Sequence, residues 1–221
     1  MLRDSETAFL VGIEPALASG DLAVVLARLR ATWPPVRLLE LLGSASARVA
    51  RLAATCLGLV GAPEHCEALV RLLGHPDDEV AAAAEDALWS IWMQAGSKAA
   101  RARLAVAIQC LRLEDFRTAV RVLESLTRED DAPAEAHHQH ALALCGLGLY
   151  DEAERAYGRA VALNPYHFAA LAGLGHVHAE RGQLAEALHW YRKALEIHPR
   201  LREIRDIIPQ LEAAVRRRIV A

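Results

Sequence analysis

The chain has 221 residues, long enough for one or two domains, and 53% of them are hydrophobic although only 5% are aromatic. The apolar residues are mostly Ala, Leu and Val, which favours helices, since runs of β-branched and aromatic residues are scarce. A formal charge of −3 excludes the strongly basic surface that nucleic-acid binding requires, and no segment reaches the ~20 apolar residues of a membrane-spanning helix. We therefore expect neither a nucleic-acid partner nor a membrane partner.

The cysteines and the N-terminus indicate a cytoplasmic protein. Because no C-x-x-C pair occurs, buried thiols in a reducing compartment are favoured over disulfides or a zinc site. The cysteines are Cys56, Cys66, Cys110 and Cys145. The first residues lack the basic start and long apolar core of a signal peptide. The excess of Arg and Ala is typical of GC-rich bacterial genomes, so we predict a bacterial source and a cytoplasmic location.

A pattern with a period of 31 residues occupies the first part of the chain. Leu38, Leu41 and Leu42 recur 31 residues later as Leu69, Leu72 and Leu73. In the same way, Val49, Ala53 and Leu57 recur as Val80, Ala84 and Leu88. Each copy combines a short amphipathic helix, a polar turn and a longer Ala-rich helix. The second copy has Trp89 and Trp92 where the first has glycines, so we expect its last helix to continue to about Met93.

This pattern resembles the short HEAT-like repeat, in which L-x-x-L and a polar turn precede V-R-x-A-A-x-A-L-G. The resemblance predicts repeats at about 36–63 and 64–93, after a degenerate opening pair at 5–32, in a HEAT-like region that spans 1–95. Similar short repeats occur in bilin-chromophore lyases and their relatives. The resemblance therefore implies, as an alternative function, an accessory factor related to these bilin-lyase-type proteins.

A second pattern, with a period of 34 residues, follows the first. Five residues recur 34 positions later: Gly148, Ala153, Tyr157, Ala160 and Pro165 correspond, in this order, to Gly182, Ala187, Tyr191, Ala194 and Pro199. The period and the order alanine, aromatic residue, small residue and proline resemble the tetratricopeptide repeat (TPR), a helix–turn–helix unit. The resemblance predicts units at 100–133, 134–167 and 168–201, within a TPR domain that spans 98–221.

An amphipathic helix at 202–219 is expected to cap the last unit, because its apolar residues fall on one stripe. The predicted fold class is therefore all-α. We expect a right-handed superhelical α-solenoid of antiparallel helix pairs, with HEAT-like repeats followed by three TPR units and the capping helix.

The motifs of common enzyme classes are missing from the sequence. We find no H-E-x-x-H, no G-x-S-x-G and no P-loop, so we expect neither an enzyme nor a cofactor. The stretch "HHQH" places His137 and His140 on one helix face, where they could supply two metal ligands. Because zinc needs three or four protein ligands, we predict partly buried imidazoles and no metal site. A metal-binding helical repeat protein remains the alternative.

The TPR resemblance implies a concave groove lined by the first helix of each unit. The residues that the repeat places there are Arg101, Leu104, Ile108, Arg112, Glu135, His138, Leu142, Cys145, Ala169, Ala172, His176 and Glu180. His138 in particular is expected to point into this groove. Chaperone-binding TPR domains carry Lys, Asn and Arg residues that clamp the terminal carboxylate of a peptide. At the corresponding positions this sequence has Leu104, Ile108, Ala169 and Gly173, which disfavours binding of chaperone C-termini.

The predicted function is a non-catalytic scaffold or adaptor that binds a protein or peptide partner in the TPR groove. Because the groove is mixed, with an apolar floor and charged edges, we expect an extended or helical peptide with apolar anchors.

Overall fold

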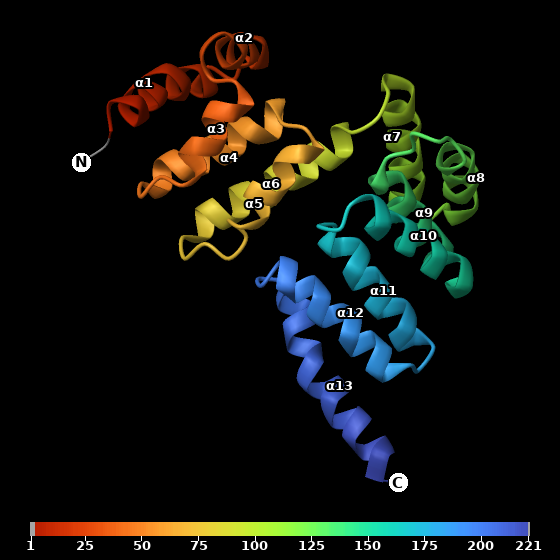
Figure 1. Ribbon diagram of the computed structural model, residues 1–221. Helices are drawn as coiled ribbons and strands as arrows, with labels where there is room; N and C mark the ends of the chain where they lie inside the picture. The colour runs from red at the N-terminus through yellow and green to blue at the C-terminus, as the bar shows by residue number, and fades with distance from the viewer. Residues whose placement is uncertain (1–2, 221) are drawn as a thin grey trace. The chain divides into compact units, whose positions relative to one another are not determined.

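A computed structural model describes residues 3–220, with side chains described from 3 to 217. Every regular element in this range is helical, with thirteen α-helices and one short 3₁₀ helix, η1 (Figure 1). The predicted all-α fold of antiparallel helix pairs is confirmed. The chain forms two compact units, Met1–Trp92 and Met93–Ala221. Among the described residues, no helix is both long enough and apolar enough to cross a membrane.

The first unit holds the elements from α1 to α6. Their bounds are α1 Asp4–Ala18, α2 Leu22–Thr32, α3 Pro35–Leu42, α4 Ala47–Val60, η1 Pro63–His65, α5 Cys66–Val70 and α6 Asp78–Gln94. Between the first two helices Gly20 adopts a φ of 69°, a conformation that favours glycine. Asp21 then starts α2 by accepting hydrogen bonds from the backbone N–H groups of Ala23 and Val24.

The 31-residue pattern marks the core of this unit. Leu38 and Leu69 are completely buried, and so are Val49 and Val80. The helix α6 ends at Gln94, so the expected continuation to about Met93 is confirmed. In the second copy the first helix, α5, has five residues and is followed by turns, so the two copies differ in their opening helix.

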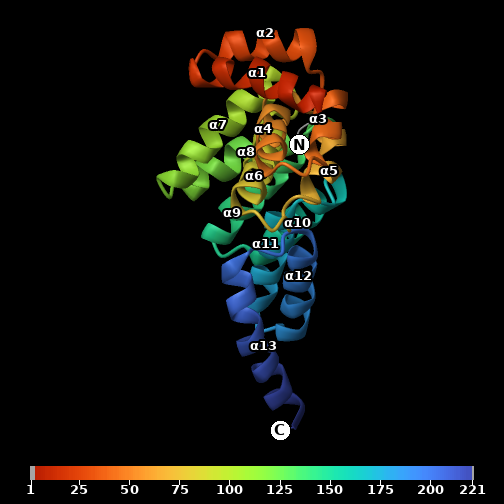
Figure 2. The same ribbon diagram turned by 90° about the vertical axis from the view of Figure 1, so that its left-hand side faces the viewer.

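The second unit holds three antiparallel helix pairs and a final helix. The bounds are α7 Lys98–Arg112, α8 Phe116–Thr127, α9 Ala134–Gly146, α10 Tyr150–Leu163, α11 Phe168–Glu180, α12 Leu184–Ile197 and α13 Arg202–Val220. The first helix of each pair packs against the second, and α13 packs on α12. Figure 2 shows this last helix running beside α12, in the blue part of the chain.

Tyrosines that enter glycine positions hold the second unit together. Tyr157 is 2% exposed and its ring occupies the space where a side chain at Gly173 would lie. Tyr191, the equivalent residue one repeat later, fills the space at Gly175 in the same way. The packing rule in this unit is that an aromatic ring of a second helix fills the space beside a glycine of a first helix. Tyr157 of α10 does so across the repeat boundary and Tyr191 of α12 within its own pair, both on α11, so the two glycines are not related by the 34-residue period.

Candidate functional site

The first helices α7, α9 and α11 line one side of the second unit, because α9 contacts both of the others. We name this side the first-helix face. Of the residues predicted to line it, those exposed are Arg101, Arg112, Leu142, His176 and Glu180. Those partly buried are Ile108, Cys145, Ala169 and Ala172. Those buried are Leu104, Glu135 and His138.

Three predicted groove residues are therefore corrected by the structure. Leu104 is 1% exposed and belongs to the apolar core of α7 and α8. His138 is 5% exposed, so the prediction that it points into an open groove is wrong. Glu135, one helical turn before it, is 1% exposed. Both residues face a neighbouring repeat and not the solvent.

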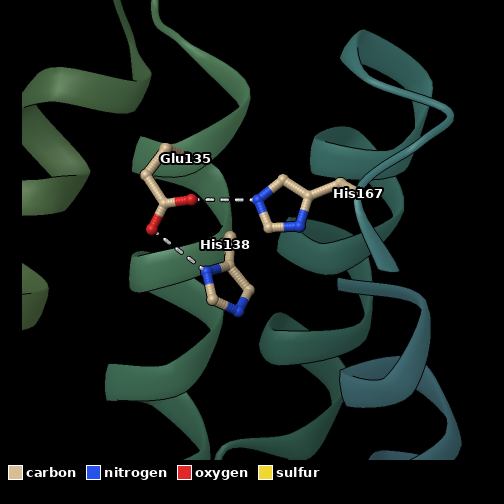
Figure 3. Close-up of side chains that lie close together, drawn as sticks. All are labelled: Glu135, His138 and His167. Atoms are coloured by element: carbon tan, nitrogen blue, oxygen red, sulfur yellow. Dashed lines mark hydrogen bonds and ion pairs between the residues drawn. The ribbon is translucent and has the colours of Figure 1, made fainter. Parts of the chain in front are cut away.

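The reason is a buried polar cluster of Glu135, His138 and His167 (Figure 3). The Nε2 atom of His167 lies 3.0 Å from one carboxylate oxygen of Glu135, and the Nδ1 atom of His138 lies 3.3 Å from the other. The Gln139 amide also donates to Glu135, at 2.6 Å. Glu135 and His138 come from α9, whereas His167 is the residue that precedes α11. The cluster therefore joins α9 to the N-terminal end of α11, the first helices of two successive helix pairs.

The hydrogen bonds assign the tautomer of His167. Its Nδ1 accepts the backbone N–H of Ala170 at 3.2 Å, which caps α11, so the ring proton is on Nε2 and is donated to Glu135. Burial lowers the pKa of His167, and this favours the neutral ring. Burial alone would raise the pKa of Glu135, but the hydrogen bonds from His138 and His167 hold that pKa well below its usual range. The cluster therefore carries a buried carboxylate at neutral pH.

His137 and His140, the two residues considered as metal ligands from the sequence, lie outside this cluster. Burial, the charge of Arg159 and the charge of His140 lower the pKa of His137 to about 4. Burial also lowers the pKa of His140. Among the described residues, the ligand-type side chains that converge are Glu135, His138 and His167. His137 and His140, the pair of the alternative metal-binding interpretation, are not part of this set.

His167 was not predicted as a site residue, because no motif or repeat position in the sequence marks it. The spacing of Glu135 and His138 was visible as E-x-x-H, which places both side chains on one face of a helix. Their third partner lies 32 residues further on, at the end of the segment "NPYH" between two helices. A contact between a helix and a distant loop leaves no periodic trace in a sequence.

A second group of polar side chains lies at the exposed part of the first-helix face, around His176. The Tyr191 hydroxyl and the Nδ1 atom of His176 are 2.7 Å apart, in hydrogen-bond contact. Burial lowers the pKa of His176, whereas the charges of Glu203 and Glu180 oppose this effect, so both carboxylates lie near the ring. The Tyr150 hydroxyl donates a long hydrogen bond of 3.5 Å to Glu180. Within the described residues, neither glutamate forms a salt bridge.

Comparison with known families identifies the class of the chain. Residues 138–201 match the family model described as tetratricopeptide repeat, and residues 35–108 match the one described as HEAT repeats. The chain is therefore an α-helical repeat protein. More particularly, it combines HEAT repeats with TPR repeats that follow them. Proteins built from such repeats typically act as adaptors in protein–protein interaction. The HEAT match extends into α7, which in the structure pairs with α8.

Several solved structures are similar to this chain in fold. One is described as the complex of the TPR2AB domain of yeast Sti1 with pHSP90. It is 16% identical over 89% of this chain and 81% of the Sti1 chain, with a TM-score of 0.49. Yeast Tom70 is 17% identical over 92% and 42% of the two chains, with a TM-score of 0.48. TTC0263, a thermophilic TPR protein of Thermus thermophilus, is 21% identical over 94% and 99%, with a TM-score of 0.41. Curated protein sequences gave no match.

Proposed function

We propose that the protein is a non-catalytic scaffold that binds a peptide segment of a partner protein on its first-helix face. The observation that carries the proposal is an exposed apolar residue on this face together with two carboxylates, Glu180 at the end of α11 and Glu203 at the start of α13, that form no salt bridge within the described residues. Four free cysteines support a reducing compartment, as the sequence predicts for a cytoplasmic bacterial protein.

Leu142 supplies the apolar contact. It is 39% exposed on α9, and His176 occupies the equivalent position on α11, one repeat later. Because α9 and α11 pack against each other, equivalent positions on these helices are neighbours. A leucine that is open to solvent beside a neighbouring repeat offers a contact for an apolar side chain of a bound peptide.

Glu180 and Glu203 supply the charge. Both carboxylates lie near the ring of His176, and the lowered pKa of this histidine leaves the ring neutral at pH 7. The neutral histidine therefore does not compensate the two negative charges. A Lys or Arg side chain of the partner would complement them. We therefore expect a peptide that carries a basic residue close to an apolar one.

The experiment begins with selection of random dodecapeptides, displayed on phage, against the full-length protein. We expect the enriched peptides to share a basic residue near Leu, Ile or Phe. A fluorescent copy of the selected peptide is then titrated against variants of the protein. Replacing both glutamates, as Glu180→Gln with Glu203→Gln, should weaken binding about tenfold, because exposed ion pairs contribute up to about 1 kcal/mol each. Leu142→Ala should weaken binding about fivefold through lost apolar contact.

The matched control is Glu196→Gln, which removes one exposed carboxylate from α12, a second helix. This variant should bind the peptide as the wild type does. Selection without any enriched peptide, or equal affinity of all the variants, would refute the proposal that the first-helix face binds the partner.

A further inference from the structure

The Glu135, His138 and His167 cluster has the composition of a metal site. One ligand atom of each residue lies within 4.8 Å of those of the other two. All three residues are at least nine-tenths buried, with exposed fractions of 1%, 5% and 0%. Figure 3 shows the carboxylate facing both rings, one from α9 and one from the residue before α11, and the ring centroids of His138 and His167 are 4.7 Å apart.

Two imidazoles and one carboxylate form a donor set that zinc and other first-row divalent metals bind in proteins. Zinc–nitrogen and zinc–oxygen bonds are about 2.0–2.2 Å long, so two ligands of one tetrahedral ion are about 3.3 Å apart. The observed separations between Glu135 and the two rings are 3.0 and 3.3 Å. These two separations are to different oxygens of the carboxylate, and one ligand atom of each residue lies within 4.8 Å of the other two. A small movement of the side chains would therefore bring three ligand atoms around one ion.

We propose that Glu135, His138 and His167 form a binding site for a divalent metal ion of the zinc class. The ion would take the place of the two hydrogen bonds within the cluster. It would connect α9 to the N-cap residue of α11, and so fasten the first helices of two successive helix pairs. This inference does not depend on partner binding at the first-helix face.

The tautomer of His167 sets the main cost of metal binding. A metal ion bound to Nε2 requires the ring proton to move to Nδ1. A protonated Nδ1 no longer accepts a hydrogen bond, so the bond from the backbone N–H of Ala170 would be lost. The loss of one helix cap is about ten times smaller than the free energy that zinc contributes at structural sites. The cap is therefore expected to yield to the ion, and this gives the site a distinctive signature at Ala170.

The test uses the full-length protein without an affinity tag, stripped of metal by a chelator. Calorimetric titration with zinc chloride should show about one equivalent bound, and cobalt chloride should give the visible absorption of a tetrahedral site. His167→Asn and Glu135→Gln should each weaken zinc binding at least tenfold. His140→Gln should leave it unchanged, because this residue lies on α9 but outside the cluster.

A second measurement separates metal binding from folding. Circular dichroism of the metal-free variants identifies any that are unfolded, and Glu135→Gln keeps the size of the side chain. Zinc should also shift the amide resonance of Ala170 in the wild type more than the amides of α12, since the cap hydrogen bond is lost. The proposal is overturned if the wild type binds no zinc or cobalt, or if a folded Glu135→Gln binds zinc as tightly as the wild type.

Discussion

At the level of single residues, the buried carboxylate of Glu135 depends on donors from three other side chains. His138 and Gln139 are its neighbours on α9, and E-x-x-H could be identified from the sequence. His167 could not, because its contact joins two repeats through a residue between helices. The burial of His138 could not be predicted for the same reason, because the ring of His167, which packs against it, comes from the segment before α11.

Glu114 has a left-handed backbone conformation, which is unfavourable for a residue with a side chain. Its φ is 55°, in the left-handed region, at the position where the later repeats have Gly148 and Gly182. That conformation costs a residue with a side chain about 1–2 kcal/mol, whereas glycine costs about 0.5–1 kcal/mol in lost chain freedom. Glu114→Gly is therefore expected to stabilise the second unit by about 0.5–1 kcal/mol, measured by thermal unfolding.

The reciprocal change provides the control for this prediction. Gly148 has a φ of 72° and no atom within 4 Å of an added Cβ, so Gly148→Ala tests the backbone conformation without a clash. This variant should lower the melting temperature. If Glu114→Gly also lowers it, backbone strain at the turn between α7 and α8 is not the dominant effect.

Glu6 in α1 is expected to make the first unit sensitive to acid. The backbone N–H of Arg3 and the Ser44 hydroxyl both donate to it at 2.7 Å, and these bonds outweigh burial to lower its pKa from 4.5 to about 2. Because the folded-state pKa is depressed, the stabilisation is present above pH 4.5 and is lost as the pH falls toward 2.

Urea unfolding followed by tryptophan fluorescence tests this, since three of the four tryptophans lie in the first unit: Trp33, Trp89 and Trp92. Between pH 5 and pH 3 the wild type should lose more stability than Glu6→Gln. The exposed residue Glu40 provides the comparison, because Glu40→Gln should follow the wild type. Parallel pH curves for all three proteins would argue against a role of Glu6.

At the level of the helices, the repeats could be predicted because each one encodes its own packing. Ala153, Tyr157 and Ala160 recur with the same spacing in α12, and all of these residues are buried. The exposure of the first-helix face was harder to predict. The rotation of about 100° per residue predicts the direction in which each side chain leaves its helix. Whether that side chain is buried depends on which neighbouring helices pack over it. Leu104 is covered by core residues, whereas Leu142 is not.

Gly173 tests the packing rule between helices. An added Cβ would lie 2.3 Å from the ring of Tyr157, which is itself buried and has little room to move. Gly173→Ala is therefore expected to destabilise the second unit by about 1–3 kcal/mol through overpacking, although alanine is the better helix former. Thermal unfolding by circular dichroism measures the change.

Gly158 is the matched control, because it lies within α10 and nothing is within 4 Å of an added Cβ. Gly158→Ala should raise stability by up to about 1 kcal/mol through helix propensity. The combination of Gly173→Ala with Tyr157→Leu should recover part of the loss, since the smaller side chain frees space. Stability equal to the wild type in Gly173→Ala would mean that the tyrosine can shift at little cost.

At the level of the whole molecule, the two sequence periods correspond to two kinds of repeat. HEAT repeats and TPR repeats are both recognised in the chain, and both kinds expose surfaces that are suited to binding other proteins. The fold follows from contacts between neighbouring repeats, so a single sequence is sufficient to predict it. The exposed side chains that we propose to contact a partner, such as Leu142 and Glu180, are not specified by either period.

The central claim is that a peptide binds on the first-helix face, and NMR chemical-shift mapping with the selected peptide tests it most directly. Binding at this face should produce the largest shifts in the methyl groups of Leu142 and in the amides of α9 and α11 around His176. Smaller shifts are expected in α10 and α12. Shifts concentrated on those second helices, or on the first unit, would contradict the claim.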